Sequence, residues 1–148
     1  MGLISQLLPQ SHVLLDAELT SKKRLFEQVG LVVEGSRGIA RSVVFDSLFS
    51  REKLGSTGIG QGIAIPHGRI KGLKEAVGVF VRLSQPLPFD APDGRPVSLV
   101  FALLVPEQGT QQHLDILSDL ADRFSDAEFR TALGSAADAS AILKSFSD

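Results

Sequence analysis

The chain has 148 residues, a length typical of one domain, and 43% of them are hydrophobic, enough to bury an ordinary core. A net charge of −2 argues against a general nucleic-acid binder, and the absence of cysteine excludes disulfides, a thiol nucleophile and a cysteine-ligated zinc site. No apolar run approaches the roughly 20 residues of a spanning helix, and the N-terminus lacks the features of a signal peptide. We therefore expect a single domain over residues 1–148, located in the cytoplasm, without membrane insertion or nucleic-acid partners.

The first third of the chain predicts one strand and two helices. Residues 12–16 are mostly apolar and predict a short strand. Thr20-Ser21 offer an N-cap, and apolar residues follow at helical spacing over 25–33. Glycines within residues 35–38 break that helix, and a second helix is predicted over residues 39–49.

The central part predicts an irregular loop followed by two strands. Residues 55–68 contain five glycines and predict a shaped loop, with a brief strand at 63–65. Residues 76–83 and 97–105 predict strands, joined by a turn or protruding loop at 86–96. The segment 97–105 is almost entirely apolar, as expected of a central strand that is covered on both faces.

Three helices are predicted in the last third of the chain. The first begins at an N-cap on Thr110 and runs to about Phe124. The second is capped by Asp126 and runs to Leu133, and the third covers residues 137–146. This order of elements predicts an α/β fold: a three-layer sandwich whose mixed central β-sheet of about five strands is flanked by helices on both faces.

His67 is the strongest candidate for a functional residue. It lies between Pro66 and Gly68 at the end of the glycine-rich segment, so that its backbone is held on one side and unobstructed on the other. An imidazole presented in this way suits a nucleophile that meets a partner's reacting atom in line. A surface histidine in a turn is the alternative interpretation from the local sequence.

The residues around His67 suggest a site for an anion. Backbone N–H groups of Gly58, Gly60 and Gly62 can point at an anion, and Ser56 and Thr57 add hydroxyl groups. Arg51 offers a fixed positive charge with bidentate geometry, although it also fits a solvated charge at a helix end.

His113 is a second candidate. With an N-cap at Thr110 it lies in the first turn of its helix, where the helix dipole favours a neutral ring and also attracts an anion. A histidine that only packs is the alternative there, and we interpret His12 as structural. No P-loop or dinucleotide motif is present, and no local spacing such as H-E-x-x-H indicates a metal site.

Residues 51–68, REKLGSTGIGQGIAIPHG, closely resemble the phosphorylation-site motif of phosphotransferase-system enzyme IIA domains of the mannitol/fructose type. The similarity is strongest to the nitrogen-regulatory branch, enzyme IIA-Ntr. The resemblance implies a mixed sheet flanked by helices, phosphorylation of His67 at Nε2, and His113 and Arg51 in the same pocket. We expect Ser56, Thr57, Gly58, Gly60 and Gly68 to bind the phosphoryl group, and we expect no metal or cofactor.

The resemblance also implies the partners. The phosphoryl donor would be a histidine-containing phosphocarrier protein of the HPr or NPr type. The acceptor would be an enzyme IIB domain in the sugar branches, whereas the nitrogen branch signals by phosphorylation state to regulatory targets. No IIB or membrane segment is fused to the chain, which favours the regulatory branch over a separate fructose/mannitol-type IIA subunit. A metal- or histidine-dependent hydrolase and a non-enzymatic anion-sensing module are the other classes left open.

Overall fold

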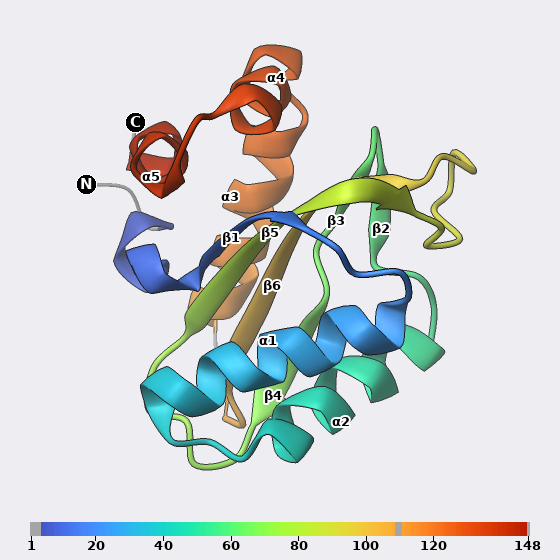
Figure 1. Ribbon diagram of the computed structural model, residues 1–148. Helices are drawn as coiled ribbons and strands as arrows, with labels where there is room; N and C mark the ends of the chain where they lie inside the picture. The colour runs from blue at the N-terminus through green and yellow to red at the C-terminus, as the bar shows by residue number, and fades with distance from the viewer. Residues whose placement is uncertain (1–3, 109–110, 148) are drawn as a thin grey trace.

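The computed structural model describes residues 4–108 and 111–147, in which a mixed β-sheet lies between two groups of helices (Figure 1). The described strands are β1 (Val13–Ala17), β2 (Gly58–Gly60), β3 (Ile63–Ala64), β4 (His67–Ile70), β5 (Val77–Leu87) and β6 (Val97–Pro106). The helices are α1 (Lys22–Arg37), α2 (Arg41–Lys53), α3 (Gln111–Phe124), α4 (Ala127–Ser135) and α5 (Ala139–Ser147), with 3-10 turns at Ser5–Leu7 and Gln10–His12. The predicted fold class is confirmed, with six strands in the described ranges.

Strand β6 organises the sheet. Its antiparallel partner on one side is β5, which is flanked by the parallel strand β1. On its other side β6 pairs in parallel first with β3 and then, further along, with β4, while β2 continues the sheet beyond β3. Between β3 and β4 the carbonyl of Pro66 accepts a hydrogen bond from the Leu103 N–H, 2.9 Å long. The segment that carries His67 is thereby held along the most buried strand.

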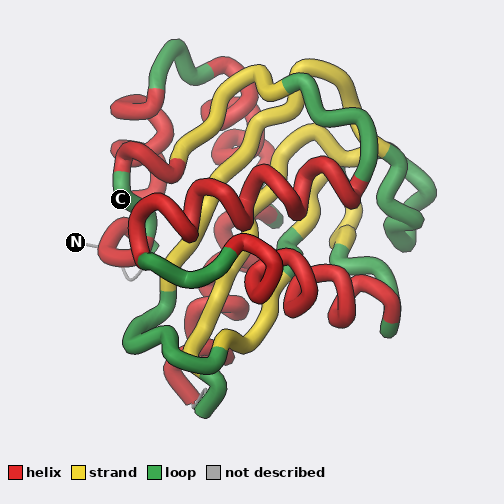
Figure 2. The backbone as a smooth tube through the Cα atoms, turned by 60° about the horizontal axis from the view of Figure 1, so that its bottom comes forward, coloured by secondary structure: helices red, strands yellow, loops and turns green. Residues whose placement is uncertain are grey.

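Side chains of β5 and β6 alternate between two cores, as the period of a strand requires. Val79, Val81 and Val100 face the core beneath α1 and α2. Phe80 and Phe101 face the core beneath α3, α4 and α5. Figure 2 shows α1 and α2 crossing one face of the sheet with the other helices behind it. The apolar run of β6 is explained, because both of its faces are covered.

Capping side chains set several helix ends. The Ser21 hydroxyl accepts the Arg24 N–H, 3.1 Å away, and Gly38 ends α1 with a φ of 72°. Asp126 accepts the Glu128 N–H at 3.0 Å. These caps confirm the predicted ends, whereas the predicted cap at Thr110 lies outside the described residues. None of the helices within the described ranges is long and apolar enough to cross a membrane.

Three predicted boundaries were wrong. Helix α2 continues to Lys53 rather than ending near residue 49, since residues 51–53 are good helix formers. The segment 55–68 contains the predicted brief strand at 63–65, which is β3, and in addition β2 and the start of β4, which were not predicted. Strand β2 pairs with β3, while β3 and β4 pair with β6, whose buried backbone groups need hydrogen-bond partners. Strand β5 extends through Pro86 to Leu87, which shortens the loop before β6.

Candidate functional site

His67 opens strand β4, and its half-buried ring is held by one hydrogen bond. Nδ1 lies 3.0 Å from the carbonyl oxygen of Ile65. A carbonyl oxygen only accepts, so this bond places the hydrogen of the neutral ring on Nδ1. Nε2 is then left with its lone pair, which is the form that can attack an electrophile.

The surroundings of His67 favour the neutral ring. Burial lowers the pKa of His67, and electrostatic interactions with Arg51 and His113 lower it further. The bond to Ile65 and the carboxylate of Glu52 act in the opposite direction, and the net effect places the pKa below the ordinary 6.5. His67 is therefore unprotonated at neutral pH.

Arg51 lies in the last turn of α2, and its charge reaches His67. Its Nη1 donates to the carbonyl of Gly55 at 3.0 Å, which fixes the side chain across the start of the glycine-rich segment. Within the described ranges no other hydrogen bond occupies the guanidinium, whose remaining N–H groups can bind an anion.

His113 lies in the first turn of α3 and is close enough for its charge to lower the pKa of His67. Its Nδ1 is buried, and no described residue forms a hydrogen bond with it. A buried polar atom without a partner costs about 1–3 kcal/mol. The position at a helix N-terminus favours an anion nearby. The structure thus brings His67, Arg51 and His113 together from β4, α2 and α3.

The groups of Ser56, Thr57 and Gly58 form bonds within the fold, which differs from the sequence-based expectation that they point at an anion. The Ser56 hydroxyl donates to the carbonyl of Phe89 and accepts the Gly58 N–H at 3.0 Å. The Thr57 hydroxyl and N–H both donate to the carboxylate of Glu52. These groups shape the segment that precedes His67.

Gly60 and Gly68 are required by conformation and by space. Gly60 has a φ of 92°, in the region that favours glycine. A Cβ at Gly68 would lie 2.2 Å from Oγ of Ser47 and 3.2 Å from its backbone carbon. Glycine at residue 68 therefore lets strand β4 approach α2 without displacing Ser47.

Two charged residues near the site were missed by the sequence analysis. Glu52 is buried in the last turn of α2, and Lys22 forms an ion pair with it at 2.9 Å. In the sequence Glu52 stands between Arg51 and Lys53, and three consecutive charged residues are typical of a solvated helix end. The spacing of α2 does indicate that Glu52 is buried, because it continues the buried face of Val44 and Leu48 at intervals of four residues.

His12 lies apart from the cluster of His67, Arg51 and His113. Its Nδ1 donates to the carbonyl of Gly78 at 2.9 Å, and its Nε2 accepts the Ser36 hydroxyl at 2.7 Å. In the described part of the chain, no three or more His, Asp or Glu side chains are arranged to hold a metal ion.

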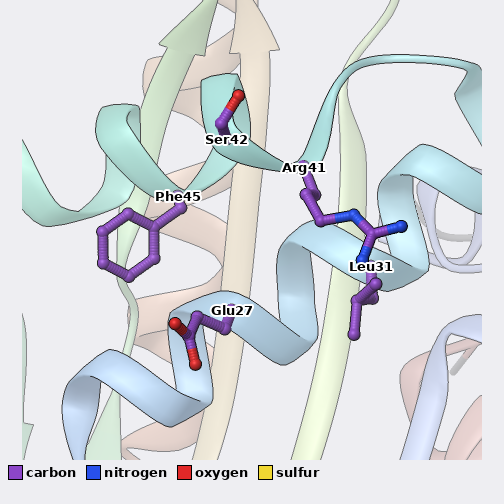
Figure 3. A pocket seen from close by; sticks show the side chains of 5 residues that line it. All are labelled: Glu27, Leu31, Arg41, Ser42 and Phe45. Carbon is purple, nitrogen blue, oxygen red and sulfur yellow. The ribbon is translucent and has the colours of Figure 1, made fainter.

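A separate pocket of about 390 Å³ lies between α1 and α2. Figure 3 shows Glu27 of α1 and Phe45 of α2 on facing helices, with Arg41 beside Leu31. The pocket is mainly apolar and shares no residue with the cluster around His67.

Comparison with known proteins decides the family. A family model described as "Phosphoenolpyruvate-dependent sugar phosphotransferase system, EIIA 2" matches residues 6–148. The chain belongs to the EIIA 2 family. A nitrogen regulatory protein of Pseudomonas aeruginosa is 41% identical over 140 residues, covering 94% of this chain and 91% of the relative. The nitrogen regulatory protein of Escherichia coli K12 is 50% identical over 107 residues, covering 72% of this chain and 66% of the relative.

Solved structures support the placement in the EIIA 2 family. The crystal structure of nitrogen regulatory protein IIA-Ntr from Neisseria meningitidis is 52% identical, with a TM-score of 0.93, and the match covers 97% of this chain and 99% of the other. The crystal structure of mannitol IIA from Escherichia coli matches with a TM-score of 0.77 at 19% identity, covering 93% and 97% of the two chains. The second likeness shows the fold alone.

Proposed function

We propose that this chain, as one EIIA domain over residues 1–148, is a cytoplasmic phosphocarrier of the nitrogen-related phosphotransferase system. It accepts a phosphoryl group on Nε2 of His67 from a histidine phosphocarrier protein of the HPr or NPr type, and it signals to regulatory targets by its phosphorylation state. Relatives called nitrogen regulatory proteins are 37–50% identical, whereas a fructose-specific EIIA component of Haloferax volcanii is 33% identical, which favours the regulatory branch.

One observation carries the proposal. The ring of His67 is fixed by the bond from Nδ1 to the Ile65 carbonyl, and this bond leaves Nε2 as the free, unprotonated nitrogen. The pKa of His67 is lowered by burial and by the charges of Arg51 and His113. A weak base that is neutral, oriented and bordered by positive charge suits attack on an anionic phosphoryl group.

The transfer exchanges one nitrogen–phosphorus bond for another. Nε2 of His67 forms the new bond while the bond to the donor's imidazole breaks, and the bonding electrons stay on the donor nitrogen. Arg51 and His113 offset negative charge on the phosphoryl oxygens. Nδ1 of His67 keeps its hydrogen and its bond to Ile65 as the ring gains positive character.

Exposed apolar side chains beside the site would contact the donor protein. Leu54 follows Arg51 in the chain at the end of α2 and is 84% exposed, and Leu114 follows His113 and is 54% exposed. Exposed large apolar residues that flank polar site residues are common in transient protein interfaces.

The test is intact-mass spectrometry at neutral pH after the chain is mixed with phosphoenolpyruvate, enzyme I and the histidine phosphocarrier. We expect one added phosphoryl group of about 80 Da that is labile to acid, because a phosphoimidazole is an activated intermediate. The variant His67→Ala should fold and gain no mass. An unlabelled wild-type chain beside a normally labelled IIA domain would contradict the proposal, as would a labelled His67→Ala variant.

A further inference from the structure

A buried ion pair lies behind the glycine-rich segment. The side chain of Glu52 is 4% exposed, and its carboxylate accepts a hydrogen bond from Lys22 Nζ at 2.9 Å. Lys22 is the first residue of α1 and also lies over the ring of Phe89, 4.7 Å from its centroid. A buried carboxylate is costly without a cation and hydrogen-bond donors, and Glu52 has both.

Thr57 joins this ion pair to the segment before His67. Its hydroxyl donates to Oε1 of Glu52 at 2.5 Å, and its N–H lies 3.2–3.3 Å from the two carboxylate oxygens. The residue is therefore fixed through its side chain and its backbone at once. A carboxylate accepts at both oxygens, so Glu52 can receive these bonds together with the one from Lys22.

The same bonds continue to the ring of His67. The carbonyl of Thr57 accepts the Ile65 N–H at 3.0 Å. The carbonyl of Ile65 in turn accepts the hydrogen on Nδ1 of His67, also at 3.0 Å. Three successive links, Glu52 to Thr57, Thr57 to Ile65 and Ile65 to His67, thus connect the Glu52 carboxylate with the Nδ1 atom of His67.

We propose that Glu52, held by Lys22, is a positioning residue that keeps His67 in the Nδ1–H tautomer with Nε2 free to react. The proposal rests on the proposed phosphocarrier function. Glu52 acts by fixing Thr57, and through it the Ile65 carbonyl, at the place where the His67 ring needs an acceptor.

The charge of Glu52 gives the proposal a second readout. Electrostatic interactions with Arg51 and His113 lower the pKa of His67, whereas the interaction with Glu52 raises it. The bond to Ile65 raises the pKa of His67 as well. Loss of the carboxylate should therefore lower the pKa of His67 both directly and through a weakened bond.

The experiment compares Glu52→Gln and Thr57→Val with a control, Glu34→Gln. Like Glu52, Glu34 forms an ion pair, but its partner is Arg41 and the pair lies at the far end of α1. Nitrogen-15 NMR of the unphosphorylated His67 ring reports which nitrogen carries the hydrogen. Phosphotransfer from the histidine phosphocarrier is measured on the same samples.

We expect His67 to be Nδ1–H in the wild type and in Glu34→Gln, and to populate the Nε2–H form in Glu52→Gln and Thr57→Val. The phosphotransfer rate of both site variants should fall about tenfold to a hundredfold, the loss typical of a misplaced reacting group. The pKa of His67 should be lower in Glu52→Gln than in the wild type.

Unchanged tautomers in both variants would overturn the proposal, even if their rates fell. If Glu52→Gln does not fold, Thr57→Val decides, because it keeps the ion pair and removes one bond to it. A wild-type chain that accepts no phosphoryl group would contradict the phosphocarrier function, while the ring NMR would still test whether Glu52 positions His67.

Discussion

In the proposed phosphocarrier, the hydrogen on Nδ1 of His67 decides which ring nitrogen can react, and burial together with neighbouring groups decides the pH range in which it can. The hydrogen bond to the Ile65 carbonyl holds the hydrogen on Nδ1, and burial together with Arg51 and His113 lowers the pKa of the ring. A doubly protonated ring has no lone pair to donate, so His67 should stop accepting the phosphoryl group as the pH falls through its pKa. Since that pKa is below the ordinary 6.5, acceptance should persist into mildly acidic solution.

Replacing His113 by Gln tests how far His113 lowers the pKa of His67. His113 lowers the pKa of His67, so its removal should raise that pKa toward the ordinary value. The acid limb of the phosphotransfer rate should then shift to higher pH, and the rate at neutral pH should fall because one stabilising group is lost. NMR titration of His67 beside the rate profile checks both. An acid limb at the wild-type pH would show that His113 acts only in packing.

The candidate site could be predicted in part from its residues. His67 was identified because Pro66 and Gly68 flank it, and the structure places Arg51 and His113 within electrostatic reach of it. Glu52 was not identified, because three consecutive charges resemble a solvated helix end. Its role depends on Lys22, thirty residues earlier, and on tertiary contacts that a local pattern does not contain.

Helices α1 and α2 pack closely where Gly30 faces Arg41. A Cβ at residue 30 would lie 2.8 Å from the backbone carbonyl oxygen of Arg41, which a flexible side chain cannot relieve. Gly35, in the same helix, has nothing within 4 Å of the corresponding position. Substitutions at Gly30 and Gly35 therefore distinguish the effect of close packing from the effect of helix propensity.

Alanine at these two positions should have opposite effects. Gly30→Ala should lower the free energy of unfolding by about 1–3 kcal/mol, the usual cost of overpacking. Gly35→Ala should raise it by about 0.5–1 kcal/mol, because alanine is the better helix former. Urea denaturation of both variants measures the difference. Equal changes of the same sign would mean that α1 and α2 are not in close contact at Gly30.

Elements with a strong local pattern could be predicted, and elements that depend on a distant partner could not. Helix α1 has a cap, an apolar stripe and a terminal glycine, and its extent agrees with the prediction to within a few residues. The brief strand predicted at residues 63–65 corresponds to β3, whereas β2 and β4 were not predicted. These two strands have three and four residues, too few to show a period, and they are strands because β3 and β6 pair with them. The glycines in residues 55–68 also favour a loop prediction over a strand prediction.

At the scale of the whole molecule, His12 ties together parts that are distant in sequence. It ends a 3-10 turn before β1, donates to Gly78 in β5 and accepts from Ser36 in α1. Burial lowers the pKa of His12, and the charge of Arg37 adds to this effect, although the bond to Gly78 opposes it. The folded protein therefore holds this ring neutral at a pH where the unfolded chain would protonate it.

The free energy of unfolding should fall as the solution is made acidic. Below about pH 6.5 the unfolded chain binds protons at His12 and His67 that the folded chain does not, and the loss continues down to the lowered pKa values. His12→Asn keeps an amide donor for Gly78 but does not titrate, so its stability should depend less on pH between about 7 and 5. Denaturant unfolding at several pH values checks this. A wild-type pH dependence in this variant would show that His12 does not titrate differently on folding.

The pairing of β4 with β6 gives the site an order of assembly. His67 is aligned with Leu103, thirty-six residues later in the chain, and the strand between them in sequence, β5, pairs with the opposite edge of β6. A ribosome-bound chain that has been made only as far as His67 contains neither the strand that holds the histidine nor the helix that carries His113. The proposed nucleophile is thus made early in synthesis, but its site is complete only when the second half of the protein has folded around it.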